Sequence, residues 1–182
     1  MGGINMARII YKAGYKGQNH LECIEGIEIE LLNGQKALIY PKYAERPLLK
    51  SVQISKWDAR IETEIGALRL ENTAHKTEQL FALGSRAAKW VNQFCSDKHG
   101  VFNLPSLLAA MVIQQQQEEI DALAKTIEGA DLLRNFTGYV WSCSRGSENL
   151  GWIAYGYFGF AGSNGLSNSF NSNLSVPVVL YR

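Results

Sequence analysis

Apolar and polar positions alternate in the first third of the chain. Residues 27–31 alternate isoleucine or leucine with glutamate, the period-two pattern of a half-buried β-strand. The dipeptide at 33–34, Asn-Gly, favours the tight turn of a β-hairpin, and the apolar run 37–40 predicts the returning strand. Residues 7–11 predict a further strand, whereas the mixed pattern of residues 48–70 predicts no definite element.

From residue 73 to residue 130 the apolar spacing changes to three and four, which is typical of amphipathic helices. The first stripe consists of Leu80, Leu83, Ala87, Trp90, Val91 and Phe94. A second helix is predicted to open at Leu104-Pro105-Ser106, with Pro105 before its first turn, and to bury Leu107, Leu108, Met111 and Val112. The polar run 114–117 predicts a break. A third stripe follows, made of Ile120, Leu123, Ala124 and Ile127, with Gly129 as its predicted C-cap.

Helical spacing disappears after Gly138. Apolar stretches at 139–141, 151–158 and 176–181 predict strands. Between the last two lies the segment 163–175, which is almost entirely Ser and Asn. The chain therefore predicts an α+β protein whose last quarter differs in composition from the rest.

Composition and charge narrow the classes of partner. The 182 residues are 46% hydrophobic, which is ordinary for a folded domain. With 18 basic and 17 acidic residues the net charge is +1, so we expect no nucleic-acid partner. No apolar run approaches the roughly 20 residues of a membrane span, so we expect no membrane insertion. Three scattered cysteines and the lack of a signal-peptide pattern predict free thiols in a protein made in a reducing cytoplasm.

The motifs of common enzymes are missing from the sequence. His20, His75 and His99 are far apart and show no metal-ligand spacing, and no Gly-x-Ser-x-Gly nucleophile motif occurs. The glycines around 159–162 lack the Lys-Ser/Thr pair of a phosphate loop. No Asp or Glu follows Glu148, which argues against a calcium-bridged sugar in the last part of the chain. We therefore predict no catalytic residues, no metal and no cofactor.

The run 155–160 and the Ser/Asn segment after it share the residue types of antibody binding loops. Tyrosine offers a large amphipathic contact area with few rotatable bonds, while Ser and Asn supply adaptable hydrogen bonds. Alternation along the strand at 151–158 predicts Trp152, Ala154 and Gly156 facing inward, and the positions between them, Ile153, Tyr155 and Tyr157, facing outward. A binding surface is the favoured interpretation. Packing of the tyrosines against the protein's own core and a disordered loop are the alternatives.

Several motifs occur in one order that resembles a known family. They are Leu104-Pro105-Ser106-Leu107 at a helix start, Glu119–Leu123 and Ile127-Glu128-Gly129, Tyr139–Ser144, Gly151-Trp152 and Pro177-Val178. This order, over residues 80–182, resembles C-type-lectin-like domains of the formylglycine-generating-enzyme type, and most of all the variable proteins that retroelements diversify in phages and gut bacteria. The enzymes of that type need a reactive cysteine pair. Only Cys143 lies in the corresponding zone, so an enzyme is not expected.

The resemblance implies a diversified, outward-facing set of positions. Carried over to this chain, the ligand-binding residues are Arg145, Ser147, Glu148, Asn149, Ile153, Tyr155, Tyr157, Phe158, Phe160, Asn164, Leu166, Asn168 and Phe170. Trp141, Ser142, Trp152 and Pro177 are implied to be scaffold. The chain departs from the family pattern at Cys143, where serine is usual, at Val176, where arginine is usual, and in a longer segment between Gly159 and Leu174.

These observations predict an α+β, C-type-lectin-like fold with two to three helices packed on short antiparallel strands and an N-terminal β-hairpin region. Residues 1–70 would form that β-rich region, as part of the same domain or as an attachment element, and 71–182 the ligand-binding domain. The predicted function is non-enzymatic recognition of a protein or glycan ligand on a cell surface, by a protein displayed on a virion or cell. The alternative is an assembly module of a phage tail or surface structure, in which the same aromatic face joins subunits of a homo-oligomer.

Overall fold

The Asn33-Gly34 hairpin is the organising element of the N-terminal region. Gly34 adopts φ +77°, a left-handed conformation that glycine permits without steric cost, and it connects strands β2 (Ile24–Glu30) and β3 (Lys36–Ile39). Strand β1 (Arg8–Tyr11) pairs with the outer side of β2. The predicted hairpin and the predicted strand at 7–11 are confirmed.

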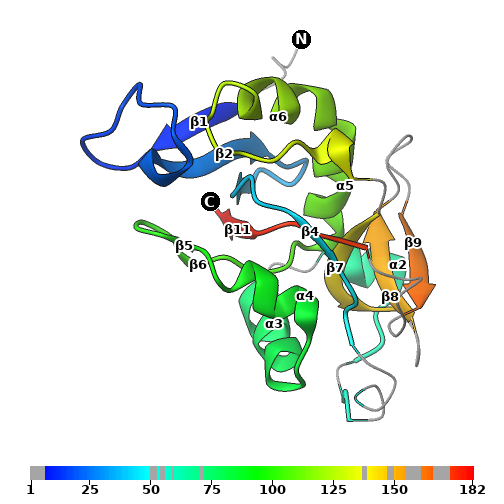
Figure 1. Ribbon diagram of the computed structural model, residues 1–182. Coiled ribbons are helices and arrows are strands. Elements are labelled where there is room, and N and C mark those ends of the chain that lie inside the picture. The colour runs from blue at the N-terminus through cyan, green and yellow to red at the C-terminus, as the bar shows by residue number, and fades with distance from the viewer. Residues whose placement is uncertain are drawn as a thin grey trace.

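The computed structural model describes residues 7–49, 53, 56–58, 60–69, 72–136, 139–146, 150–154, 161–165 and 173–182, with residues 150, 152, 154 and 161–165 described by their backbone alone (Figure 1). Two sheets organise these residues. The first is antiparallel and has the order β1-β2-β3-β11, with β11 spanning Val178–Tyr181. The second has the order β4-β10-β7-β8-β9. The chain is a mixed α+β protein, as predicted.

The second sheet is assembled from distant parts of the chain. Its strands are β4 (Ala44–Arg46), β7 (Val140–Arg145), β8 (Leu150–Ala154), β9 (Ala161–Gly165) and β10 (Asn173–Ser175). Strand β10 runs parallel to β7, and the other neighbours are antiparallel. A short separate hairpin consists of β5 (Cys95–Ser96) and β6 (Gly100–Val101).

The apolar stripe from Leu80 to Phe94 forms two helices where its continuous spacing suggests one. Helix α3 (Thr73–Ala82) ends before Gly84, whose φ of +84° turns the chain, and Ser85 then caps α4 (Arg86–Val91) by accepting a hydrogen bond from the Ala88 amide. A five-residue helix, α2 (Glu64–Leu68), precedes them in the stretch with no predicted element.

The second and third predicted helices are α5 (Leu107–Gln115) and α6 (Gln117–Ala124). Ser106 caps α5 after Pro105, and the break falls at Gln116, so both predictions are confirmed. The predicted C-cap is wrong, because α6 ends at Ala124 and Gly129 lies in the following turn. Two single-turn 3-10 helices, η1 (Leu21–Cys23) and η2 (Leu133–Asn135), complete the described elements.

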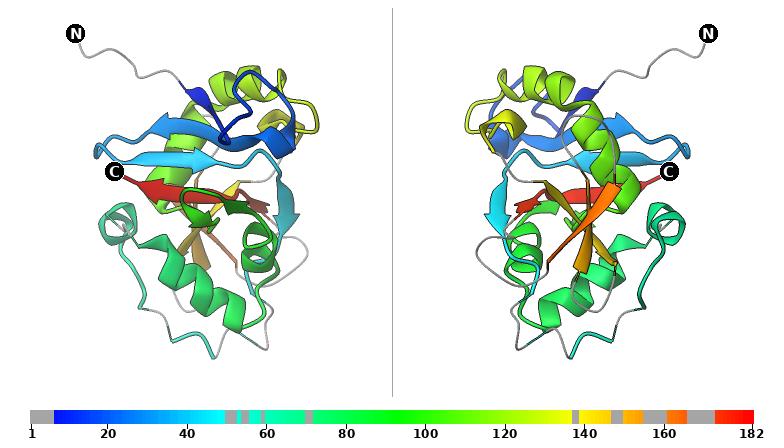
Figure 2. Two further views of the ribbon diagram at one scale, coloured as in Figure 1. Left: turned by 90° about the vertical axis from the view of Figure 1, so that its left-hand side faces the viewer. Right: turned by 90° about the vertical axis from the view of Figure 1, so that its right-hand side faces the viewer.

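Three apolar clusters fill the spaces between these layers. The first lies between α5, α6 and the inward side chains of both sheets, such as Ile27, Ile113 and Val140. The second joins α3 and α4 to β7 and β8 and includes Leu48, Leu49 and Trp57. The third lies on the other face of the first sheet, where Leu38 and Val179 meet Phe102. Figure 2 shows α3 and α4 on one side of the molecule and α5 and α6 on the other, with the sheets between them.

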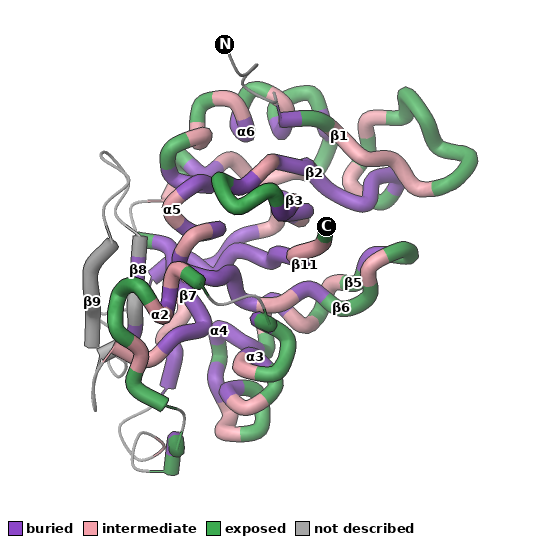
Figure 3. Tube along the Cα trace, turned by 180° about the vertical axis from the view of Figure 1, so that it is seen from behind, coloured by how far each residue is buried: buried purple, intermediate pink, exposed green. Residues whose placement is uncertain are grey.

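Strand β2 is buried on both faces, although its alternation predicts a half-buried strand (Figure 3). The second face is covered by the β5–β6 hairpin, which is distant from β2 in the sequence but contacts it directly. Glu25 is 1% exposed and accepts hydrogen bonds from the Ser96 hydroxyl (2.5 Å) and the Asp97 amide (2.9 Å) of that hairpin. Glu28 is 8% exposed and pairs with Arg8. The acidic positions are therefore buried with partners, because tertiary packing supplies donors that the local sequence does not show.

Candidate ligand-binding surface

Strand β7 is the buried support of the predicted surface. Trp141 is fully buried, and its indole Nε1 donates a hydrogen bond of 2.8 Å to the Arg46 carbonyl at the end of β4. Pro177 is also buried. Residues 141–145 form an extended strand. A fully buried indole with its N–H satisfied fixes this strand against the second apolar cluster.

Ile153 faces the core, and its predicted outward orientation is wrong. It is 1% exposed and belongs to the cluster of Trp141 and Cys143. It lies opposite Trp141 in the antiparallel pairing of β7 with β8, so the two side chains share one face of the sheet. The predicted alternation has the wrong phase at Ile153, because a strand with apolar residues on both faces does not indicate which face the helices cover. Ile153 is therefore a core residue and not part of the ligand-binding surface.

Arg145 is the last residue of β7 and connects the strand to the segment before α2. Its guanidinium lies over the Trp57 ring, 5.1 Å from the centroid, and donates a hydrogen bond to the Trp57 carbonyl. The Glu62 amide donates a hydrogen bond of 2.8 Å to the Arg145 carbonyl. Trp57 is buried and Ile61 forms a parallel bridge with Arg145, so these contacts join Trp57, Ile61 and Glu62 to the end of β7. Arg145 is half-buried.

Of the other predicted ligand-binding residues, one lies on a described strand and the rest lie outside the described residues. Asn164 stands on β9 opposite Gly151, and its backbone alone is described. Ser147, Glu148, Asn149, Tyr155, Tyr157, Phe158, Phe160, Leu166, Asn168 and Phe170 lie outside the described residues. The alternation that predicts Tyr155 and Tyr157 outward also predicts Ile153 outward, so the outward orientation of the two tyrosines rests on the resemblance alone and stays a prediction.

Cys143 is the cysteine nearest to this surface, and it is fully buried. Burial raises the pKa of the Cys143 thiol to about 12, against an opposing effect of the Lys76 ammonium. Lys76 itself forms a 3.1 Å ion pair with Glu62. Because the thiolate is the nucleophilic form, a thiol held protonated is a poor nucleophile.

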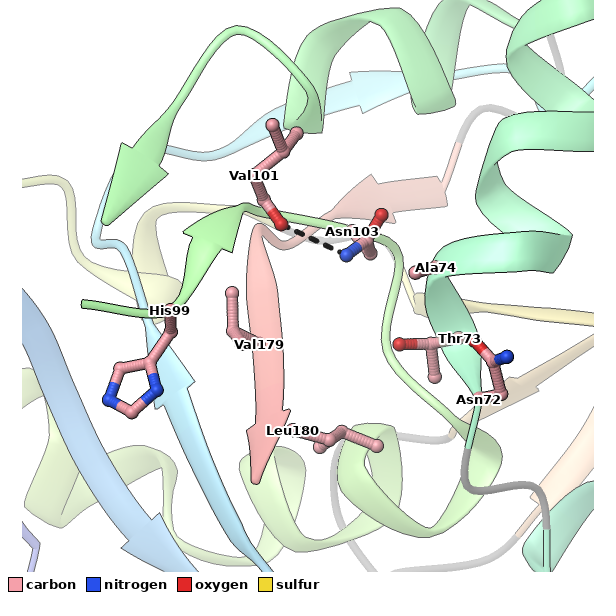
Figure 4. A pocket seen from close by; sticks show the side chains of 8 residues that line it. All are labelled: Asn72, Thr73, Ala74, His99, Val101, Asn103, Val179 and Leu180. Carbon is pink, nitrogen blue, oxygen red and sulfur yellow. Dashed lines mark hydrogen bonds between the residues drawn. The ribbon is translucent and has the colours of Figure 1, made fainter. Parts of the chain in front are cut away.

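A cavity in the described part of the chain lies away from the predicted surface, between the start of α3, strand β6 and strand β11 (Figure 4). Its volume is about 340 Å³, and its walls include Asn72, Thr73, His99, Asn103 and Leu180. At its rim the His99 ring stacks on Tyr181 with 4.0 Å between centroids. Sequence reasoning did not find this hollow, because its walls come from three separate segments.

The Tyr181 hydroxyl links this rim to the first sheet by donating a hydrogen bond to Glu28. Burial raises the pKa of Glu28, but hydrogen bonds from Tyr181 and Arg8 and the charge of Arg8 outweigh it, so the net pKa is lowered. Burial, followed by the hydrogen bond to Glu28, raises the pKa of Tyr181. The pair therefore consists of an ionised carboxylate and a neutral phenol at neutral pH.

Comparison with protein-family models, with curated proteins and with solved structures finds no match for this chain. Among the described residues, no group of three or more His, Cys, Asp or Glu side chains is arranged to hold a metal ion. None of the described helices is both long and apolar enough to span a membrane.

Proposed function

We propose that this chain is a non-enzymatic ligand-binding protein that displays a diversified surface on a C-type-lectin-like scaffold. The proposed surface consists of Tyr155, Tyr157, Phe158 and Phe160 together with the Ser/Asn-rich segment that follows. The ligand would be a protein or glycan on a cell surface. The fold name and the membership in the retroelement-diversified proteins are part of this proposal and rest on the motif order in residues 80–182.

One observation carries the proposal: the segments of binding-loop composition begin and end on strands of one sheet. The chain leaves the sheet at Ala154 on β8, returns for β9, leaves again at Gly165 and returns at Asn173 on β10. Asn173, Leu174 and Ser175 are buried, so the far end is held as firmly as the near end. Binding residues on segments whose ends are set by a rigid scaffold are the common arrangement in recognition proteins.

The proposed surface is tested by thiol labelling in a Cys95→Ser background, which removes the exposed native cysteine. Tyr155→Cys and Tyr157→Cys should react with a maleimide reagent at the rate of a free thiol, because the tyrosines face solvent. The matched control is Ile153→Cys on the same stretch of chain, which should react far more slowly because Ile153 is buried. Slow labelling at 155 and 157 in the folded monomer would place the tyrosines in the core and contradict the proposal.

The diversified origin of the surface has a separate test in the genome. We expect a near-copy of the coding segment for residues 140–182 beside a reverse transcriptase gene, with differences confined to adenines. Those differences should fall in the codons of the surface residues and spare Trp141 and Pro177, which are buried. A surrounding sequence without such a copy would contradict diversification and leave the thiol-labelling result to decide the exposure of the surface.

A further inference from the structure

The cavity at the start of α3 has three walls, and every residue that lines it belongs to the described part of the chain. Helix α3 forms one wall, the β5–β6 hairpin together with Asn103 forms the second, and β11 forms the third (Figure 4). Its volume of about 340 Å³ lies within the range of small-molecule sites. The lining residues include no Asp or Glu, so no carboxylate of the wall repels an anion.

Hydrogen bonds of the fold itself hold the three walls together. The hydroxyl of buried Thr77 donates 2.8 Å to the Thr73 carbonyl and accepts a hydrogen bond of 3.1 Å from the Leu104 amide, which joins α3 to the segment after β6. Asn103 and Val178 exchange two backbone hydrogen bonds of 2.9 Å, which joins the same segment to β11. The shape of the cavity is therefore set before any ligand enters, and preorganisation of this kind lowers the cost of binding.

The hydroxyl of Thr73 is the polar group that points into this cavity. Thr73 is 4% exposed, and among the described residues its hydroxyl has no hydrogen-bond partner. Figure 4 shows the oxygen directed away from α3, into the hollow and toward Val179. Buried side-chain hydroxyls in folded proteins are in the large majority hydrogen-bonded. A ligand in the cavity would supply the partner that the fold does not.

Hydrogen-bond donors gather around that hydroxyl. Thr73 is the first residue of the ten-residue helix α3, and the amides of a first helical turn have no partner within their helix and carry a partial positive charge. The Asn72 carboxamide oxygen accepts the His75 amide at 3.3 Å, so its Nδ2 group remains a donor. On the second wall, Asn103 uses one N–H of its carboxamide on the Val101 carbonyl and keeps the other. This set of groups favours a ligand atom that accepts hydrogen bonds and bears negative charge.

The remaining lining is apolar, which sets the other half of the ligand. Val101, Val179 and Leu180 present hydrocarbon to the cavity from the second and third walls (Figure 4). The lining includes no Lys or Arg, so it has no side-chain cation to balance a dianion such as phosphate. A single negative charge matches a helix start and one hydroxyl, and a short hydrocarbon chain matches the valine and leucine side chains.

We propose that this cavity is a second binding site, which takes a small monocarboxylate with a short branched hydrocarbon chain. The carboxylate accepts hydrogen bonds from the Thr73 hydroxyl and from the first-turn amides of α3. The hydrocarbon packs against Val179 and Leu180. None of the lining residues belongs to the proposed diversified surface, so this site does not depend on the function proposed for that surface.

The experiment is titration of the isotope-labelled full chain with 3-methylbutanoate, followed by the chemical shifts of its backbone amides. The shifts of Thr73, Ala74 and Asn103 should saturate together, with a dissociation constant on the order of 1 mM, as expected for a ligand of few atoms. Two other probes separate the halves of the ligand. The alcohol 3-methyl-1-butanol keeps the hydrocarbon without the charge, and inorganic phosphate keeps charge without the hydrocarbon. Each should bind about tenfold more weakly or less.

Variants of Thr73 test the hydroxyl itself. Thr73→Val keeps the shape of the side chain and should raise the dissociation constant for 3-methylbutanoate about tenfold, because the carboxylate loses a charge-assisted hydrogen bond. Thr73→Ser keeps the hydroxyl and should bind within about twofold of the wild type. The matched control is Thr126→Val, the same change at an exposed threonine after α6, which should leave binding unchanged. The amide spectrum of each variant shows directly whether it is folded.

A blocking variant tests the cavity independently of the hydroxyl. Val101 is 49% exposed in the wall, so Val101→Trp should be tolerated by the fold and should abolish binding by filling the hollow. This variant decides the question if Thr73→Val does not fold. Lack of saturable shifts at α3 and Asn103, unchanged binding in Thr73→Val or in Val101→Trp, or equal binding of the alcohol would each overturn the proposal. The last result would indicate an apolar hollow without a carboxylate site.

Discussion

Carboxylates hold together parts of the backbone that lie far apart in the chain. Buried Asp121 on α6 accepts hydrogen bonds from the amides of Leu133 (2.7 Å) and Arg134 (3.0 Å), which fixes the 3-10 helix η2 against α6. Buried Glu25 does the same for the turn of the β5–β6 hairpin. Hydrogen bonds to charged groups contribute more than neutral ones, about 1.5–3 kcal/mol each. These residues are therefore structural, although acidic side chains suggest sites when only the sequence is known.

Thiol accessibility gives a prediction for the three cysteines. In the native protein one thiol, that of Cys95, should react with a disulfide reagent, because Cys23 and Cys143 are buried. All three should react in denaturant. The raised pKa of Cys143 favours the neutral thiol, so this contribution to stability is complete below its ordinary value of 9.0 and declines as the pH rises toward about 12. Rapid reaction of two or more thiols in the folded protein would contradict the burial of the core cysteines.

Ile153 provides a second prediction at this scale. Ile153→Asn should lower the free energy of unfolding by about 3 kcal/mol or more, since it removes buried apolar volume and buries an amide without a partner. The matched control is Ile65→Asn on α2, where the isoleucine is 62% exposed and the change should stay within about 0.5 kcal/mol. Urea denaturation measures both. Equal effects of the two substitutions would contradict the burial of Ile153 and indicate that its side chain faces solvent.

At the scale of elements, the β5–β6 hairpin is attached by contacts that a small number of side chains make. The Ser96 hydroxyl accepts hydrogen bonds from the Lys98 and His99 amides at 3.2 and 3.1 Å and donates one to Glu25. Phe102 then buries its ring beside Leu38 and Val179. The hairpin has four residues in its strands, so its position depends on these contacts and not on its own pairing.

Ser96→Ala should therefore loosen the hairpin turn. Amide hydrogen exchange at Lys98 and His99 should become faster by roughly fivefold, since a neutral hydrogen bond contributes ~1 kcal/mol and 1.4 kcal/mol corresponds to a factor of ten. The control is Ser85→Ala, which removes the cap of α4 and should speed exchange at Ala88 without affecting the hairpin. Unchanged exchange at 98 and 99 in Ser96→Ala would show that the Ser96 hydroxyl does not hold the turn.

At the scale of the whole molecule, the N-terminal and C-terminal parts of the chain share their sheets. Strand β3 pairs with β11 from Lys36 opposite Tyr181 to Ile39 opposite Val178, and β4 pairs with β10. Residues of the first 70 also fill the second apolar cluster, where Leu48 and Trp57 meet Trp141. Removal of either part would expose an apolar face of the other.

We accordingly expect a single cooperative unfolding transition. Tryptophan fluorescence reports on the four tryptophans, of which Trp57, Trp90 and Trp141 lie around the second apolar cluster, while far-UV circular dichroism reports on the helices and both sheets. The two signals should give the same midpoint in urea, which is the test of a two-state transition. Separate midpoints would indicate that residues 1–70 form an attachment element that unfolds by itself.

The local sequence determined the elements whose signals are short-ranged. The Asn33-Gly34 turn, the Ser106 cap after Pro105 and the break at Gln116 depend on the conformational preferences of adjacent residues, and all three were predictable. The α+β class follows from the change of apolar period along the chain. The composition of residues 155–175 likewise belongs to the sequence alone, and it carries the proposal of a binding surface.

The tertiary structure decided which faces are covered. Ile153 faces the core because α3 and α4 pack on the Trp141 side of the second sheet, and Glu28 is buried because Arg8 and Tyr181 reach it from other strands. The segment with no predicted element, 48–70, supplies Leu48, Leu49 and Trp57 to a core formed with residues about a hundred positions away. Sheet order also decided that β9 is an edge. Burial and pairing between distant segments depend on the position of each element in the assembled chain, and a local apolar pattern carries no information about it.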